Sequence, residues 1–97
     1  MGCYLVANIV IDDRKEYKKY ERRIFRHLRK YGGELLCVDD NPETIDGKDI
    51  DGRLLIMKFS TKQVAKNWFF DKDYQEMAKK YRYHCSEVKF VSLLENE

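Results

Sequence analysis

The sequence predicts an α+β fold of ferredoxin-like topology, in which a four-stranded antiparallel sheet carries helices on one face. Short segments rich in β-branched residues alternate with longer segments whose apolar residues recur every three or four positions. The resulting order is β-α-β-β-α-α-β, and a split βαβ pair of this kind forms such a sheet. At 97 residues the chain fits one domain, residues 1–97.

The first strand and the first helix are predicted for residues 4–11 and for the segment between Asp12 and Gly33. Both faces of this strand are largely apolar, so we expect both to be covered. Asp12 or Asp13 caps the helix, and one glycine of the Gly32-Gly33 pair adopts the left-handed conformation that ends it. The apolar stripe of the helix consists of Tyr17, Tyr20, Ile24, Leu28 and Tyr31.

The second half of the chain supplies the remaining elements. Ser60 or Thr61 begins a second helix, and the segment 71–73 separates it from a third. Residues 40–52 form an acidic loop longer than an ordinary hairpin turn, which suggests a binding loop or a dimer arm. The other predicted elements are strands at 34–39, 53–59 and 87–94 and the third helix at 74–81.

Composition and cysteine content exclude several classes of protein. Hydrophobic residues make up 43% of the chain, which argues against disorder. The longest apolar runs are far shorter than the roughly 20 residues that a membrane span needs. Three scattered cysteines are too few for a disulfide framework and do not have the spacing of a metal site. We therefore expect a cytoplasmic protein with reduced thiols and no membrane segment.

The alternation within the central strands predicts a homodimer. One register of each strand is nearly all apolar and belongs beneath the helices, whereas the other register mixes apolar and polar residues. A sheet face of this mixed kind suits a two-fold subunit interface better than open water. The predicted interface residues are Val6, Asn8, Val10, Leu54 and Ile56.

Several motifs resemble a known family over nearly the whole chain. In order, they are Tyr4-Leu-Val-Ala7, Asp12, Tyr17, Tyr20, Tyr31-Gly-Gly33, Glu43, Gly47, Arg53 to Phe59, Ala65, Trp68, Tyr74-Gln75 and Arg82. Together they resemble the DUF1330 family of the dimeric α+β barrel superfamily. The resemblance implies the barrel fold and dimerisation. It implies little chemistry, because the activity of that family is unknown.

Four residues are candidate ligand contacts in a pocket between sheet and helices: Asn8, Trp68, Arg82 and His84. Asn8 is polar in a central strand, so it either contacts a ligand or bonds to the backbone or to its mate across the dimer. Trp68 fits either core packing or an aromatic platform. His84 has a pKa suited to proton transfer but needs a carboxylate nearby, such as Glu87.

Arg82 has two interpretations that the sequence leaves open. A guanidinium can hold a carboxylate bidentately, so Arg82 with Tyr17, Tyr20 and Tyr74 can form a pocket for a small acidic metabolite. Alternatively, Arg82 pairs with an acidic residue of the 40–52 loop.

The main function hypothesis is a homodimeric small-molecule-binding protein or minor enzyme. No nucleophile–base pair, phosphate-binding loop or metal motif is present, so the sequence predicts no cofactor or metal and leaves catalysis undecided.

The alternative function is that of a non-catalytic interaction module that recruits an anionic partner, nucleic acid included. The binding surface would be residues 14–31, where nine side chains are basic and two acidic. The middle of the strand 53–59 reads Leu-Leu-Ile-Met and offers no aromatic side chain to stack on bases. The acidic segment 34–52 can also neutralise the basic helix, so both observations argue against nucleic acid.

Overall fold

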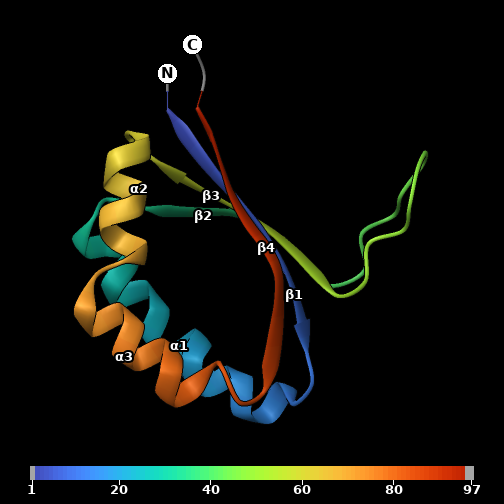
Figure 1. The fold of residues 1–97 in the computed structure, drawn as a ribbon, viewed down its shortest axis with the longest axis horizontal. Coiled ribbons are helices and arrows are strands. Elements are labelled where there is room, and N and C mark those ends of the chain that lie inside the picture. Colours follow the sequence, from blue (N-terminus) through green and yellow to red (C-terminus); the bar gives the residue numbers. More distant parts are fainter. Residues whose placement is uncertain (1, 96–97) are drawn as a thin grey trace.

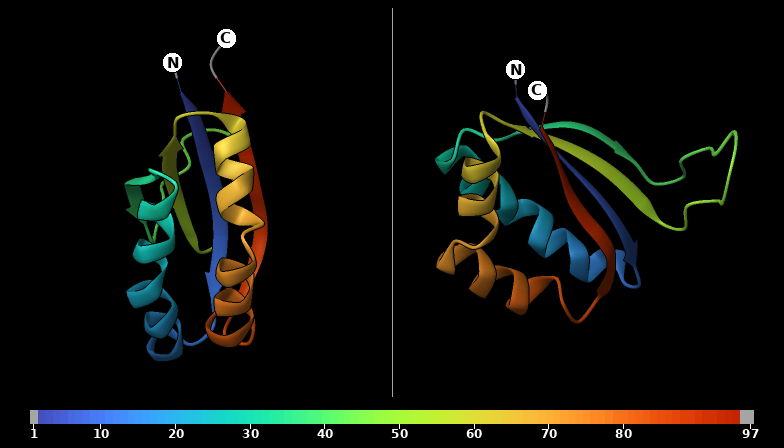
Figure 2. Two further views of the ribbon diagram at one scale, coloured as in Figure 1. Left: turned by 90° about the vertical axis from the view of Figure 1, so that its left-hand side faces the viewer. Right: turned by 45° about the horizontal axis from the view of Figure 1, so that its top comes forward.

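A four-stranded antiparallel sheet with three helices on one face forms the protein in the computed structural model, which describes residues 2–95 (Figure 1). The strands are β1 (Cys3–Ile11), β2 (Glu34–Asp39), β3 (Arg53–Phe59) and β4 (Ser86–Glu95), in the spatial order β2-β3-β1-β4. The helices are α1 (Arg14–Lys30), α2 (Lys62–Phe69) and α3 (Lys72–Tyr81). In Figure 2, α1 stands beside a second column formed by α2 and α3. The predicted topology is confirmed.

The central strand β1 pairs with β3 on one side and with β4 on the other. Leu5 lies opposite Met57 and Leu93, and Ala7 lies opposite Leu55. Because side chains alternate along a strand, this register points toward the helices and is buried. The buried residues of this register include Leu5, Ala7, Ile9, Leu55, Met57 and Phe59, as the sequence predicts, whereas Ile11 at the end of β1 is partly buried.

Each helix begins at a residue whose side chain accepts a backbone hydrogen bond. Asp13 accepts from the Glu16 N–H, Thr61 from that of Val64, and Asp71 from that of Tyr74. These contacts satisfy donors that the first turn of a helix leaves free. The short polar side chains therefore determine where the helices start.

The glycine pair after α1 allows the chain to turn closely into β2. Gly32 has a φ of +68°, the left-handed conformation that glycine adopts without strain. At Gly33 an added Cβ would lie 2.6 Å from the Leu28 side chain and 2.7 Å from that of Phe59. One glycine is therefore needed for its backbone angle and the other for its lack of a side chain.

Residues 40–52, which we call the arm, connect β2 to β3 and extend away from the rest of the chain (Figure 1). Asp40 binds Arg53 at 2.6 Å and Arg14 of α1 at 3.1 Å at the base of the arm. Farther out, Ile45 is 93% exposed. The expected contact between the acidic segment and the basic helix thus occurs at the base of the arm.

No helix or strand of residues 2–95 covers the sheet face opposite the helices (Figure 2). Val6, Val10, Leu54 and Ile56 lie on it, together with Phe90 and Leu94 of β4, which pair with Asn8 and Tyr4. Phe90 is 41% exposed and Leu94 57%. The outer face is therefore apolar across three neighbouring strands.

Asp71 joins the start of α3 to the end of α1. Its carboxylate accepts hydrogen bonds from the Tyr31 hydroxyl at 2.5 Å and from the Tyr74 N–H at 3.0 Å, and it lies 3.3 Å from the Lys30 ammonium group. The Tyr31 hydroxyl, followed by the Tyr74 N–H and Lys30, lowers the pKa of Asp71 to about 2. Its charged form is therefore stabilised by folding.

The Asp71→Asn substitution retains a capping side chain and removes the charge. Because folding lowers the pKa of Asp71 from 3.8, the carboxylate stabilises the wild type above that value, and the contribution is lost as pH falls toward 2. We expect the free energy of unfolding, measured by denaturant titration, to decrease less in Asp71→Asn than in the wild type between about pH 5 and 2.5. Asp73→Asn, in the same turn, should behave like the wild type; equal pH dependence of all three proteins would contradict this account.

Candidate functional site

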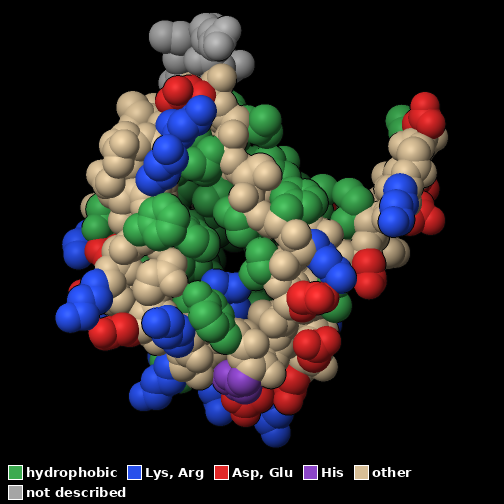
Figure 3. Space-filling view, in the orientation of Figure 1, with side chains coloured by type: hydrophobic (Ala, Val, Ile, Leu, Met, Phe, Trp, Pro, Cys, Tyr) green, Lys and Arg blue, Asp and Glu red, His purple; other side chains and the backbone are tan. Residues whose placement is uncertain are grey.

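A cavity of about 80 Å³ lies between the inner face of the sheet and the helices. The strands contribute aliphatic side chains such as Leu5 and Ala7, and the helices contribute aromatic ones such as Tyr20, Phe25 and Trp68. Figure 3 shows the molecule hollowed at this place, with hydrophobic side chains around the opening and a basic side chain within. Since one water needs about 10–15 Å³, the space accommodates several waters or a small organic molecule.

The cavity stays open because the helices do not cover the edges of the sheet. Val38 of β2 and Val91 of β4 line the cavity and are 41% and 37% exposed. Phe25 of α1 lines it from the opposite side and is also exposed. A small molecule can therefore enter without separation of the sheet from the helices.

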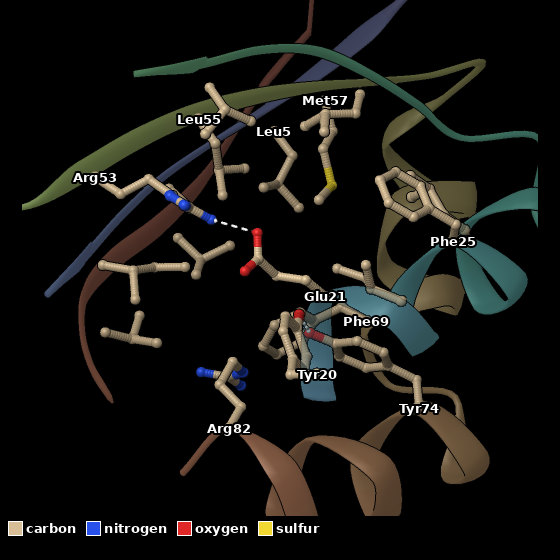
Figure 4. Close-up of a pocket in the computed structure, with 18 of the residues that line it drawn as sticks. Leu5, Tyr20, Glu21, Phe25, Arg53, Leu55, Met57, Phe69, Tyr74 and Arg82 are labelled. Carbon is tan, nitrogen blue, oxygen red and sulfur yellow. Dashed lines mark hydrogen bonds and ion pairs between the residues drawn. The ribbon is translucent and has the colours of Figure 1, made fainter. Parts of the chain in front are cut away.

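Arg53 and Glu21 form a paired charge in the cavity wall (Figure 4). The Arg53 Nη1 atom lies 3.1 Å from a Glu21 carboxylate oxygen, and the Arg53 Nε atom lies 2.6 Å from Asp40. Burial alone would lower the pKa of Arg53, but its hydrogen bonds to Asp40 and Glu21 outweigh burial and raise the pKa. The charge of Arg53 is thus compensated within the chain.

Arg82, at the end of α3, is a second cation in the wall and has no such compensation. It is 5% exposed, and its guanidinium points toward the cavity (Figure 4). Its Nε atom has no hydrogen-bond partner among residues 2–95, and no ion pair in that range includes it. The alternative pairing of Arg82 with the acidic loop is wrong, because the loop carboxylate of Asp40 binds Arg53 and Arg14.

Two buried tyrosine hydroxyls lie beside Arg82. The hydroxyl oxygens of Tyr20 and Tyr74 are 2.7 Å apart, and the Arg82 guanidinium lies 5.6 Å from the Tyr20 ring centre (Figure 4). Burial raises the pKa of both tyrosines, although the positive charge of Arg82 acts in the opposite direction. Both hydroxyls therefore keep their hydrogens at neutral pH. Tyr17, Tyr20 and Tyr74, the tyrosines that the sequence groups with Arg82, all line the same cavity as Arg82, and their contact with a ligand stays a prediction.

Trp68 is both a core residue and part of the cavity wall. Its ring centre lies 4.5 Å from that of Tyr74 and 5.5 Å from that of Phe59. It also lines the cavity, and its indole N–H is buried without an acceptor in the described part of the chain. Core packing of Trp68 is therefore observed, and its role as an aromatic platform for a ligand stays a prediction.

Asn8 and His84 do not line the cavity. The Asn8 amide donates to the backbone oxygens of Asp51 and Arg53 at 2.8 and 2.9 Å, so it holds the start of β3 against β1. His84 is exposed, and its Nε2 atom lies 3.5 Å from a Glu16 carboxylate oxygen, not beside Glu87. Of the four candidate residues, the structure brings Trp68 and Arg82 together.

The Glu21–Arg53 pair is a feature of the cavity that the sequence did not reveal. Its members are 32 residues apart, and no local periodicity connects them. The sequence feature that could have indicated this pair is Glu21 itself, because it is one of two acidic residues in a helix that contains nine basic residues.

The described residues provide no metal site: no group of three His, Cys, Asp or Glu side chains in residues 2–95 is arranged to hold an ion. The three cysteines are free, with Cys3 and Cys85 buried and Cys37 exposed. Within the same residues, no helix combines the length and the apolar character that crossing a membrane requires.

Solved structures with this fold are similar to the chain along most of its length. They include a protein of unknown function from Rhodopseudomonas palustris, RPA0582 (TM-score 0.71, 12% identity, covering 96% of this chain and 78% of that chain). SnoaB, a cofactor-independent oxygenase from Streptomyces nogalater, has a TM-score of 0.67 at 10% identity, over 99% of this chain and 93% of its own. The protein YjcS has a TM-score of 0.60 at 15% identity, over 100% of both chains.

At these identities the likeness shows the fold alone, a four-stranded antiparallel sheet with helices on one face. The sequence identifies the family. Residues 2–95 match the family described as Domain of unknown function (DUF1330), and the chain belongs to that family. No curated protein matches the sequence.

The Tyr74→Phe substitution tests the tyrosine pair at the cavity wall. Removing one hydroxyl leaves that of Tyr20 buried without its partner, and we expect a loss of about 1–2 kcal/mol in the free energy of unfolding. Tyr83→Phe is the control, because the Tyr83 hydroxyl bonds to Gln75 at an exposed position and should cost less than about 0.5 kcal/mol. Chemical denaturation measures both variants, and an equal effect would show that the buried pair contributes nothing specific.

Proposed function

We propose that this protein is a homodimer that binds a small, largely apolar organic molecule in the cavity between sheet and helices. The observation that carries the proposal is the cavity itself, which the protein's own side chains leave open. Protein interiors are close-packed, and voids larger than a water molecule are few. A preformed apolar cavity with a small number of polar groups is the usual form of a ligand site.

Binding is better supported than catalysis by the groups in the wall. Glu21, the carboxylate among the described lining residues, is held by Arg53. The Tyr20 and Tyr74 hydroxyls bond to each other and have raised pKa values, so they do not act as bases at neutral pH. SnoaB is a cofactor-independent oxygenase of similar fold, which supports a small organic molecule as the ligand class.

The basic helix α1 is a weaker candidate for function. Arg14 pairs with Asp40, Lys30 pairs with Asp71, and Arg23 lies 4.1 Å from the Tyr81 ring centre. These contacts pair part of the positive charge of α1 with other groups of the fold, and the remaining basic side chains fit an ordinary solvated surface. Recruitment of an anionic partner through α1 therefore stays the alternative, and nucleic acid is not the partner that we propose.

The dimer follows from the outer face of the sheet. Three neighbouring strands present apolar side chains there, and no element of this chain covers them in the described residues. In a two-fold dimer with the sheets face to face, the same apolar surface of each copy would cover that of the other. We propose that Val6, Val10, Leu54 and Ile56 lie at this interface, with Asn8 beneath it bonded to the backbone.

Binding of benzamide, a neutral probe, tests the cavity. We expect saturable chemical-shift changes at the backbone amides of Leu5, Ala7 and Leu55 in 1H–15N spectra. Val91→Trp should reduce the affinity for benzamide at least tenfold, because an indole at this partly exposed lining position fills the space. Lys66→Trp places the same side chain on the exposed surface of α2 and should bind as the wild type does. No saturable shifts in the wild type would contradict the proposal.

The Val6→Asp substitution tests the dimer. Burial of apolar area contributes about 25 cal/mol per Å², so the pairing of two sheets adds several kcal/mol to a small fold. A charge at Val6 should therefore convert a dimer to a monomer in sedimentation velocity and lower the melting temperature. Gln63→Asp adds the same charge on the exposed surface of α2 and should remain dimeric. A monomeric wild type at micromolar concentration, with Val6→Asp equally stable, would rule out this interface.

A further inference from the structure

Arg82 is the least compensated group in the wall of the cavity. A buried guanidinium without a counter-ion is costly, because it gives up hydration and gains no charge partner. Its Nε atom has no acceptor among residues 2–95, and the carboxylates of Asp40 and Glu21 are held by Arg53. The surroundings therefore contain a fixed positive charge that lacks a matching negative one.

The aromatic neighbours of Arg82 hold its guanidinium in place. The guanidinium carbon lies 4.8 Å from the ring centre of Tyr83 and 5.6 Å from that of Tyr20, within the range of cation–π attraction. Aromatic faces stabilise the cation but accept no conventional hydrogen bond along the guanidinium edge. The N–H groups directed at the cavity thus stay available to an acceptor that enters it.

The tyrosine pair adds a donor at the same place. Two hydroxyls 2.7 Å apart carry two hydrogens, and their mutual hydrogen bond uses one of them. No other hydrogen bond among residues 2–95 uses the second hydroxyl hydrogen. Figure 4 shows both hydroxyls beside Arg82 at the cavity. This corner of the cavity therefore presents donors from the Tyr20–Tyr74 pair and from Arg82, and no carboxylate among the described residues binds them.

The rest of the cavity is apolar and electrically balanced. Arg53 pairs with Glu21 and Asp40, so one uncompensated positive charge remains in the described wall. Leu5, Met57 and Trp68 surround the remaining space. A ligand that matches these surroundings carries one negative charge at one end and an apolar body at the other.

We propose that the ligand is a small monocarboxylate whose carboxylate binds Arg82 and the Tyr20–Tyr74 pair, with its apolar body in the space lined by the sheet. This inference rests on the proposed function and names the ligand class. The planar carboxylate matches the guanidinium edge, and its charge replaces the counter-ion that the chain does not supply. A single free cation does not balance a phosphate dianion, so phosphate is a poorer match.

Benzoate and benzamide distinguish the inference from the proposed function, because they have nearly the same shape and differ in charge. We expect the wild type to bind benzoate at least tenfold more tightly than benzamide by calorimetry or by NMR titration. Arg82→Met should lose the preference and bind benzoate no more tightly than benzamide. Arg82→Lys should retain part of the preference. Arg22→Met removes one positive charge from the exposed surface of α1 and should keep the full preference.

Stability provides a readout that a merely structural arginine would not give. Removing an unpaired buried charge should leave the melting temperature of ligand-free Arg82→Met equal to or above that of the wild type. Benzoate should raise the melting temperature of the wild type and not that of the variant.

Three outcomes would overturn the inference. If benzamide binds in the cavity and benzoate binds no better, the carboxylate site is absent while the proposed function stands. If neither probe binds, both fail. If inorganic phosphate displaces benzoate at comparable concentration, the site is a general anion site and the monocarboxylate assignment is wrong.

Discussion

The burial of one register of β1 and β3 beneath three helices is the constraint on which the rest of the structure depends. Leu5 and Ala7 of β1 pair with Met57 and Leu55 of β3, so the centre of the sheet presents a continuous apolar surface to the helices. A small domain has few other residues with which to build a core. The aromatic residues of the helices complete it, with Trp68 stacked between Phe59 and Tyr74.

The same packing explains why a cavity remains. Large rigid rings close the space near α2, whereas the outer strands β2 and β4 extend beyond the area that the helices cover. Val38 and Val91 consequently face a hollow from opposite edges of the sheet. The core and the cavity are thus formed by the same layer of side chains, and Trp68 belongs to both.

Two arginines in the cavity wall show how environment assigns different roles to identical side chains. Arg53 begins β3, close to the base of the arm, where Asp40 and Glu21 bind it. Arg82 ends α3 on the opposite wall, where its neighbours are the rings of Tyr20 and Tyr83. The first arginine connects the arm, the sheet and α1, and the second leaves a positive charge that a ligand can match.

The order of elements, the starts of α1 and α2 and the buried register could be predicted from the sequence alone, because they depend on local physics. The start of α3 was predicted incorrectly: the sequence places it at residue 74, whereas Asp71 caps α3 and the helix begins at Lys72. Side-chain alternation assigned Leu55, Met57 and Phe59 to one face, and short polar residues such as Thr61 marked the helix starts. The partners of the polar groups were decided by the tertiary structure. Asn8 bonds to backbone 43 and 45 residues away, and His84 lies beside Glu16, 68 residues away.

Which arginine stays free also depended on the tertiary structure. Either Arg53 or Arg82 could have met the acidic loop, since spacing along the chain does not measure distance in space. The antiparallel register of β2 and β3 places Asp40 beside Arg53, and none of the ion pairs in residues 2–95 includes Arg82. An ion pair forms only where the fold brings two charges within a few ångströms of each other, and the local sequence pattern does not determine that distance.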